Sequence, residues 1–218
     1  MPKKVLIAFD SPSDVMSLPD FPREADTEYY LSIASAHKTP DVVEQHSDYC
    51  KWDGIIAGAG MCNALKDAYL SHADVATVLV ALPMDDKATR GVSSMLSSSE
   101  TPPGYPIGMV GIGNLPAAVR FVNYALQQHK RVSLHSKGST VEPGKTMEDA
   151  AKMLKRLGVE YQFPTQVEPD TLNLLAYDNP LNFAIADNVS IICTCNMPAE
   201  LRRTGDLTLH GSVFILMV

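Results

Sequence analysis

The sequence predicts an α/β fold, a three-layer sandwich in which helices cover both faces of a central, mainly parallel sheet. Short apolar runs alternate with helical patterns along the chain, which is typical of such a sheet. Polar or glycine-containing turns follow the first three apolar runs, as expected of loops at the carboxyl end of parallel strands. A chain of 218 residues, 45% of them apolar, can bury a core of this size without metal or disulfide support.

The first part of the chain supplies five strands and four helices. Each predicted strand is a short apolar run bounded by turn residues. We expect strands at residues 5–9, 29–34, 55–57, 77–82 and 107–112. We expect helices at residues 40–51, 63–71, 91–98 and 115–129.

The rest of the chain predicts a C-terminal α/β extension. Apolar residues recur at three- and four-residue steps over residues 146–157, which predicts a helix, and Gly158 suits its left-handed stop. Strands are expected at residues 132–135, 190–194 and 212–218. We therefore expect an α/β domain at residues 1–130 and an extension at residues 131–218. Because both halves follow a similar order, a degenerate second copy packed on the same sheet is a hypothesis.

Charge and composition exclude several classes of protein. A net charge of -7 argues against a binder of duplex nucleic acid, which carries a basic face. The four cysteines form no CxxC pair and no histidine lies at zinc-finger spacing from them, so no metal site is expected. No stretch approaches the ~20 apolar residues of a membrane span, and the first apolar run is too short for a signal peptide. We expect a cytoplasmic protein.

Three segments follow the first three predicted strands, at residues 10–14, 35–40 and 58–63. In an open parallel sheet the carboxyl ends of the strands form the ligand crevice, so these segments are expected at one rim. Their agreement predicts a binding site for a small ligand.

The first segment offers the hydroxyls of Ser11 and Ser13 and the carboxylate of Asp14. Such a turn can donate hydrogen bonds to a phosphate, while a carboxylate can accept them from ribose hydroxyls. A turn that only caps the following residues is the alternative. The neighbouring Asp10 is unfavourable for a phosphate, because a second carboxylate repels an anion.

The second segment places His37 beside Lys38. Thr39 at the cap and Pro40 at the first position predict a helix whose amino terminus points at the rim and suits an anion. Lys38 adds a full charge, and His37 can exchange a proton near neutral pH. A histidine with a structural role is the alternative interpretation.

The third segment lacks side chains at Gly58 and Gly60, which lets a ligand approach the backbone closely. It is not the dinucleotide fingerprint, because the third glycine and the acidic partner are missing. The P-loop pattern is also absent from the sequence.

Together the three segments resemble the PurE family, the aminoimidazole ribonucleotide carboxylases and carboxyaminoimidazole ribonucleotide mutases of purine synthesis. The resemblance runs from residue 5 to about residue 128. It is carried by Asp10-Ser11-Pro12-Ser13-Asp14, by Ser35-Ala36-His37-Lys38-Thr39-Pro40, and by the glycine loop with the residues after it, Ala57-Gly58-Ala59-Gly60-Met61-Cys62-Asn63-Ala64-Leu65.

The resemblance implies a flavodoxin-like subunit, octameric assembly, and a reaction without metal, biotin, ATP or another cofactor. His37 would carry the proton as carboxyl is added to or removed from the imidazole carbon. The partners would be a small ribonucleotide and carbon dioxide or bicarbonate. The residues implied in substrate binding are Ser11, Ser13, Asp14, Ser35, Lys38, Gly58, Ala59, Gly60, Asn63 and Leu65.

Three departures keep other hypotheses open. Asp10 stands where the family has glycine, no long helix is expected between residues 14 and 35, and Ala64 stands where the mutase branch has histidine. The first hypothesis is carboxylation of aminoimidazole ribonucleotide, or carboxyl transfer within its carboxyamino form. The second is an inactive relative that binds a nucleotide or acts as a scaffold, and the third a carboxylase for another heteroaromatic nucleotide.

The extension bears on the missing helix. Residues 146–157 and the strand-like residues after Gly158 look like the family's first helix and second strand. They predict either a decayed tandem copy or a rearrangement in which the tail supplies what the front lacks.

Overall fold

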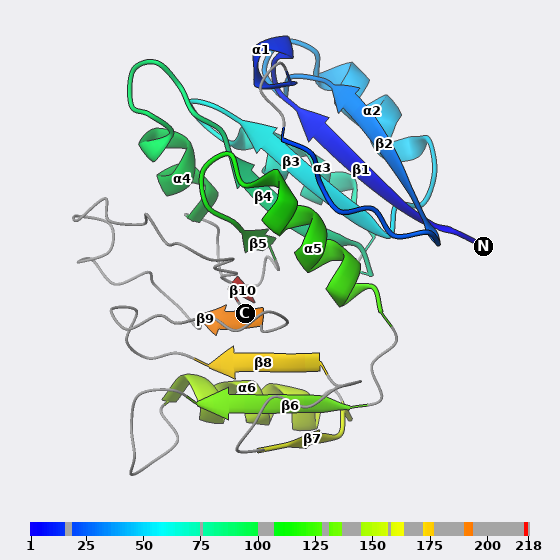
Figure 1. The fold of residues 1–218 in the computed structure, drawn as a ribbon, viewed down its shortest axis with the longest axis vertical. Helices are drawn as coiled ribbons and strands as arrows, with labels where there is room; N and C mark the ends of the chain where they lie inside the picture. The colour runs from blue at the N-terminus through cyan, green and yellow to red at the C-terminus, as the bar shows by residue number, and fades with distance from the viewer. Residues whose placement is uncertain are drawn as a thin grey trace. The chain divides into compact units, whose positions relative to one another are not determined.

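The computed structural model of the chain describes residues 1–15, 19–74, 76–99, 107–127, 131–136, 145–156, 158–163, 172–176, 190–193 and 216–217. The chain divides into two compact units, one of residues 1–101 and 107–126, the other of residues 102–106 and 127–218. Each unit has its own sheet (Figure 1). A domain boundary between residues 130 and 131 stays a prediction.

The first unit contains a five-stranded, all-parallel sheet in the order β2-β1-β3-β4-β5. The five strands predicted for this part of the chain are confirmed, although β5 is shorter than predicted. The strands are β1 Lys3–Phe9, β2 Thr27–Ile33, β3 Gly54–Ala59, β4 Val78–Pro83 and β5 Ile107–Met109.

Helices cover both faces of this sheet, which explains why its central strands are apolar throughout. All six residues of β3 are buried, a pattern typical of a parallel sheet between two helical layers. Figure 1 shows α5 in front of the sheet and α2 and α3 behind it. The predicted three-layer α/β fold is confirmed. The helices are α2 Pro40–Asp48, α3 Ala64–His72, α4 Val92–Ser99 and α5 Leu115–Ala125.

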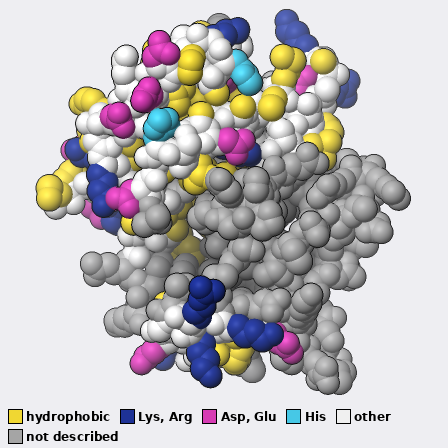
Figure 2. Space-filling model, turned by 180° about the vertical axis from the view of Figure 1, so that it is seen from behind, with side chains coloured by type: hydrophobic (Ala, Val, Ile, Leu, Met, Phe, Trp, Pro, Cys, Tyr) yellow, Lys and Arg dark blue, Asp and Glu magenta, His cyan; other side chains and the backbone are white. Residues whose placement is uncertain are grey.

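The described helices include none long and apolar enough to cross a membrane. Seen from behind, the first unit carries acidic side chains interspersed with basic and apolar ones, and they do not gather into one charged patch (Figure 2).

In its described residues, the connection between β1 and β2 contains no long helix, as the sequence predicted. It contains the single turn α1 Pro12–Val15, and residues 19–26 form neither helix nor strand. On the edge strand β2, Leu31 is 58% exposed and Ile33 is 45% exposed. Their register partners on β1, Ile7 and Phe9, are buried. The short connection therefore leaves an apolar part of β2 in contact with solvent.

The second unit has a parallel sheet in the order β10-β9-β8-β6-β7. The predicted helix is confirmed, and Gly158 after it has the expected left-handed conformation, with φ of 69°. The strand β8 was not predicted from the sequence. The elements are β6 Val132–Ser136, α6 Lys145–Arg156, β7 Tyr161–Gln162, β8 Leu172–Ala176, β9 Ser190–Cys193 and β10 Leu216–Met217.

The two sheets share one strand order. Started from β7, the second sheet runs β7-β6-β8-β9-β10, so its second strand in the chain lies outside its first, as β2 lies outside β1. The described strands of the second unit pair with one another in a separate sheet, and α6 packs on strands of that unit. That this unit is a degenerate second copy stays a prediction. The shared order and the packing of α6 favour it over a helix supplied to the first sheet.

Candidate functional site

The three predicted segments lie at the carboxyl ends of β1, β2 and β3, and Asp10 connects them. The Asp10 N–H donates to the Gly58 carbonyl at 2.9 Å, and the Asp10 Oδ1 accepts from the Ala36 N–H at 3.2 Å. The first, second and third segments therefore adjoin at one rim of the sheet, the place where open parallel sheets bind ligands.

The first segment is a tight turn held by its own serines. The Ser11 and Ser13 hydroxyls are 2.8 Å apart, and the Asp14 N–H donates to the Ser11 carbonyl at 3.1 Å. Pro12 opens the single turn α1. Ser13 is exposed, so its hydroxyl can exchange its partner for a ligand.

Asp14 is the buried acid of this turn, at 9% exposure. Burial raises its pKa above the ordinary value of 3.8, and the neighbouring charge of Asp10 raises it further, while a hydrogen bond from the Ser11 backbone lowers it. Its carboxylate lies beside Gly60, where an added Cβ would be 4.0 Å from the Asp14 Oδ1. A carboxylate in this place can accept hydrogen bonds from hydroxyls of a ligand.

The second segment presents His37 and Lys38 to solvent on a closed turn. The buried Ser35 Oγ accepts from the N–H groups of His37 and Lys38, at 3.4 and 3.3 Å. The Ser35 N–H donates to the Thr39 Oγ1 at 2.9 Å. The hydrogen bonds fix the backbone, and the imidazole and the ammonium stay accessible.

Pro40 occupies the first position of α2 and Thr39 is its N-cap residue, as predicted, although the Thr39 side chain makes no hydrogen bond to the helix. The Thr39 hydroxyl bonds back to Ser35, so it makes no cap bond to the helix. The amino terminus of α2 still follows the rim segment directly, with its partial positive charge behind Lys38.

The third segment begins inside β3, and steric contact explains its first glycine. Gly58 is buried, and a Cβ there would lie 2.7 Å from the Phe9 ring. Ala59 is also buried in the strand. Gly60 is half-buried, and an added Cβ would meet its neighbours only at ordinary contact distance. Close packing inside the fold therefore accounts for Gly58, and Gly60 is the glycine that faces the rim.

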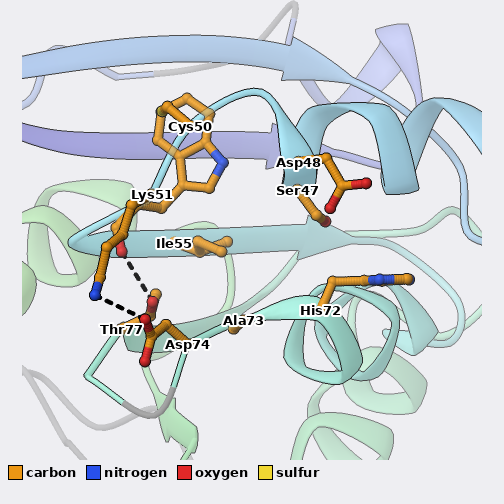
Figure 3. Close-up of a pocket in the computed structure, with 10 residues that line it drawn as sticks. Ser47, Asp48, Cys50, Lys51, Ile55, His72, Ala73, Asp74 and Thr77 are labelled. Carbon is orange, nitrogen blue, oxygen red and sulfur yellow. Dashed lines mark hydrogen bonds and ion pairs between the residues drawn. The ribbon is translucent and has the colours of Figure 1, made fainter.

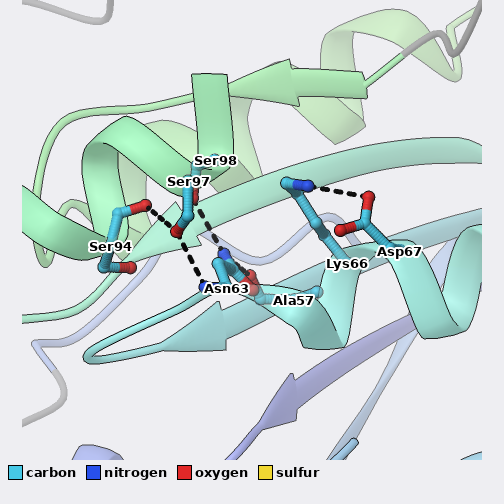
Figure 4. Close-up of polar contacts among 7 residues, drawn as sticks. All are labelled: Ala57, Asn63, Lys66, Asp67, Ser94, Ser97 and Ser98. Atoms are coloured by element: carbon cyan, nitrogen blue, oxygen red, sulfur yellow. Dashed lines mark hydrogen bonds and ion pairs between the residues drawn. The ribbon is translucent and has the colours of Figure 1, made fainter. Parts of the chain in front are cut away.

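Asn63 and Leu65, both predicted to bind substrate, are fully buried. The Asn63 Nδ2 donates to the Ala57 carbonyl at 3.0 Å and to the Ser98 hydroxyl at 3.1 Å, and its N–H donates to Ser97 (Figure 4). The Asn63 Oδ1 is buried without a hydrogen-bond partner. Their role in substrate binding stays a prediction; in the structure Asn63 fastens the glycine loop to α4.

Serines of α4 complete this fastening, and the sequence analysis missed them. The buried Ser94 hydroxyl donates to the Ala59 carbonyl. The Ser97 hydroxyl donates to the Ser94 carbonyl (Figure 4). Three serines at i, i+3 and i+4 lie on one face of a helix, which is the signal that could have identified them.

A second acid beside Gly60 was also missed. Asp86 accepts hydrogen bonds from the N–H groups of Ala88, Thr89 and Gly91 and from the Thr89 hydroxyl, which lower its pKa. Arg90, next in the chain, has a φ of 51°, a conformation that side chains rarely adopt and that is often found at functional sites. An aspartate three residues before a threonine is the turn signal that predicts this loop.

The cavity in Figure 3 lies at the other end of the sheet. It has a volume of about 280 Å³, and its lining residues form the Lys51–Asp74 ion pair of 2.7 Å and the Thr77–Trp52 hydrogen bond of 2.8 Å. Ile55 and Thr77, near the beginnings of β3 and β4, line it. It is therefore separate from the rim.

Comparisons with known proteins find similar sequences and one similar structure. The family model "AIR carboxylase" matches residues 4–141. An N5-carboxyaminoimidazole ribonucleotide mutase of Methanocaldococcus jannaschii is 37% identical over 90 residues, 41% of this chain and 55% of that protein. That of Escherichia coli K12 is 29% identical over 143 residues, 62% of this chain and 80% of that protein. A Pyrococcus abyssi mutase is 31% identical, and the chain spans 66% of its length.

Among solved structures, the PurE of Treponema denticola is 19% identical with a TM-score of 0.42, covering 72% of this chain and 91% of that one. The chain spans less than two thirds of the length of the Methanocaldococcus jannaschii and Pyrococcus abyssi mutases.

Proposed function

The chain belongs to the AIR carboxylase family, and from this premise we propose that it carboxylates aminoimidazole ribonucleotide or transfers carboxyl within the carboxyamino form of that ribonucleotide. The observation that carries the proposal is the segment of residues 35–40. Its hydrogen bonds hold the backbone in one conformation and leave His37 and Lys38 exposed, on a segment that Asp10 links to the glycine loop.

His37 is the proton carrier of the proposed reaction. When a carboxyl group replaces hydrogen on the imidazole carbon, that hydrogen leaves as a proton and needs a base, and the reverse reaction needs an acid. An exposed imidazole on a fixed backbone can do both near neutral pH. Lys38, one residue on, stabilises negative charge on the carboxylate or phosphate of the substrate.

The turn of residues 11–14 and the glycine loop hold the substrate. The Ser11 and Ser13 hydroxyls donate to the ribose phosphate, together with Ser35 and Lys38, and Asp14 accepts from ribose hydroxyls. Gly60 contacts the base and carboxylate, and the buried residues Gly58, Ala59, Asn63 and Leu65 support its loop from inside the fold. The carbon source is carbon dioxide or bicarbonate, and no other cofactor takes part.

A spectrophotometric assay tests this proposal by following interconversion of aminoimidazole ribonucleotide and its carboxylated product, with and without bicarbonate. Turnover that needs added bicarbonate selects direct carboxylation. Turnover of the carboxyamino form without it selects the mutase reaction. No turnover of either substrate contradicts the proposal.

The second candidate is an inactive relative that binds a nucleotide or acts as a scaffold. Asp10 favours it, because its charge beside the turn of residues 11–14 opposes a phosphate. Titration calorimetry with aminoimidazole ribonucleotide distinguishes it: binding without turnover identifies an inactive relative. A carboxylase for another heteroaromatic nucleotide is the third candidate, tested by the same assay with a pyridine nucleotide.

We further propose that the protein is a homo-oligomer in the cytoplasm, as the family resemblance implies. Light scattering coupled to size exclusion measures the assembly. A mass equal to one chain of 23.7 kDa contradicts it.

A further inference from the structure

Asp10 occupies a position between the three rim segments that none of the predicted roles uses. It follows the last residue of β1, and the β1–β2 pairing ends beside it with the Ala34 N–H donating to the Phe9 carbonyl at 2.9 Å. The Asp10 N–H then donates to Gly58. The backbone at Asp10 is therefore anchored from two sides, and its side chain projects where the strand ladder has ended.

The Asp10 carboxylate continues the ladder by one step. After Ala34, the next amide that donates toward β1 is Ala36, whose partner is the Asp10 Oδ1 at 3.2 Å. The amides of Ser35, His37, Lys38 and Thr39 all bond inside the segment. The Ala36 bond thus ties the closed turn to the end of β1, one residue before the imidazole that must reach the substrate.

The same carboxylate carries a charge with the opposite effect. It lies near Asp14, where its negative charge helps to raise the Asp14 pKa. A negative charge close to the Ser11–Ser13 hydroxyls also opposes the phosphate of a ribonucleotide. The hydrogen bond of Asp10 therefore acts on the placement of His37, whereas the charge of Asp10 acts on the binding of the anion.

We propose that Asp10 is a positioning residue that holds the His37 segment in its reactive place through the Ala36 amide, and that its charge weakens binding of the substrate phosphate. The inference rests on the proposed carboxylase or mutase reaction. It assigns a role to the residue at which this chain departs from the family's glycine.

Two variants separate the hydrogen bond from the charge. Asp10→Asn keeps an oxygen acceptor for Ala36 and removes the charge, whereas Asp10→Ala removes both. Asp10→Asn should keep kcat and lower KM about threefold, because the neutral amide does not repel the substrate phosphate as the carboxylate does. Asp10→Ala should lower kcat about tenfold, because a displaced His37 loses reactive geometry. Equal kcat for the two variants and the wild type overturns the positioning role, and an unchanged KM in Asp10→Asn overturns the charge effect.

Two measurements decide the inference without turnover. Hydrogen exchange with mass spectrometry follows the amides of residues 34–39, which should exchange faster in Asp10→Ala and at the wild-type rate in Asp10→Asn. Calorimetry with ribose 5-phosphate should show tighter binding to Asp10→Asn. If the wild type has no activity but both results hold, the Asp10 roles stand and the proposed reaction fails. If Asp10→Ala does not fold, Asp10→Asn alone decides the positioning role. Its side-chain oxygen should keep the hydrogen bond from Ala36, so exchange at residues 34–39 that is faster than in the wild type overturns that role.

Discussion

The connection between the first two strands differs between the two units, although both sheets have the same strand order. In the first unit, the described part of residues 10–26 contains the one-turn helix α1. In the second, the twelve-residue helix α6 lies between β6 and β7. Yet β1 and β2 pair over seven residues, and β6 and β7 over two. A crossover helix is therefore not what aligns the outer strand; pairing with a buried central strand is sufficient.

The difference has a consequence for the surface. With a single turn between them, β1 and β2 share a face on which Ile7 is buried and Leu31 is exposed, although the two residues are register partners. Ser11, Ser13 and Asp14 lie at the rim because they directly follow the carboxyl end of β1. In its described residues, the first unit has no crossover helix over the exposed side chains of its edge strand, but it has the turn that carries the proposed ligand contacts.

The largest expected effect locates activity in the first unit. His37→Asn should lower the rate of carboxyl exchange at least about 100-fold, because it removes the titratable group of the proposed proton transfer. His72→Asn is the matched control, since His72 is exposed at the far end of α3 and should leave the rate unchanged. The spectrophotometric assay measures both. In the second unit, residues 163–171 follow β7 as the His37 segment follows β2, and they contain no histidine. Residual activity in His37→Asn would therefore require a proton carrier other than a histidine of that segment.

The next effect tests what the missing helix costs. Ile7→Ala should lower the free energy of unfolding by about 3 kcal/mol, because it opens a cavity in a filled core. Leu31→Ala, its partner in register, should lower it by less than about 1 kcal/mol, because that side chain is already in contact with water. Urea denaturation measures both variants. Equal losses would mean that Leu31 is covered in solution, which would remove the contrast between the two connections.

Some of these features follow from the sequence because they depend on local patterns. The central strands β1, β3 and β4 contain continuous apolar runs, and Pro40 marks the start of α2 through its fixed φ. The strand β8 was missed because Leu172–Ala176 is a short run that periodicity cannot assign to strand or helix.

The site divides in the same way. The rim position of His37 follows from its place after a strand of a parallel sheet, which the sequence predicts. The link from Asp10 to Ala36 and the bonds from Asn63 to Ser98 join residues 26 and 35 positions apart. Such contacts depend on side-chain directions in the folded chain. The sequence therefore indicated the charge of Asp10 but not its hydrogen bond to the Ala36 amide.

A smaller effect concerns the glycine loop of the first unit, which α4 holds by polar bonds. Asn63→Ala should lower the free energy of unfolding by about 2 kcal/mol, because the buried Ala57 carbonyl and Ser98 hydroxyl both lose a donor. Ser98→Ala is the comparison and should cost about 1 kcal/mol, since Asn63 keeps its bond to Ala57. Thermal and urea denaturation measure both variants. A larger loss in Ser98→Ala than in Asn63→Ala would contradict Asn63 as the centre of this contact.

The smallest effect compares the acids in the first turns of the two crossover helices, Asp14 of α1 and Glu148 of α6. Asp14 is buried and its pKa is raised, so the unfolded chain releases this proton at a lower pH than the folded protein does. The folded protein should therefore lose stability relative to Asp14→Asn as the pH rises from 3.8 through the raised pKa, and the difference should stay constant above it.

Glu148 is exposed and pairs with Lys152 at 3.8 Å, so Glu148→Gln should change stability by less than about 0.5 kcal/mol at any pH. Urea denaturation of the three proteins measures the contrast between about pH 3.5 and pH 8, a range that includes ordinary and raised carboxyl pKa values. A pH dependence that Glu148→Gln removes and Asp14→Asn keeps would place the perturbed acid in the second unit. It would also show that α1, the single turn between β1 and β2, does not contain the acid whose pKa is raised.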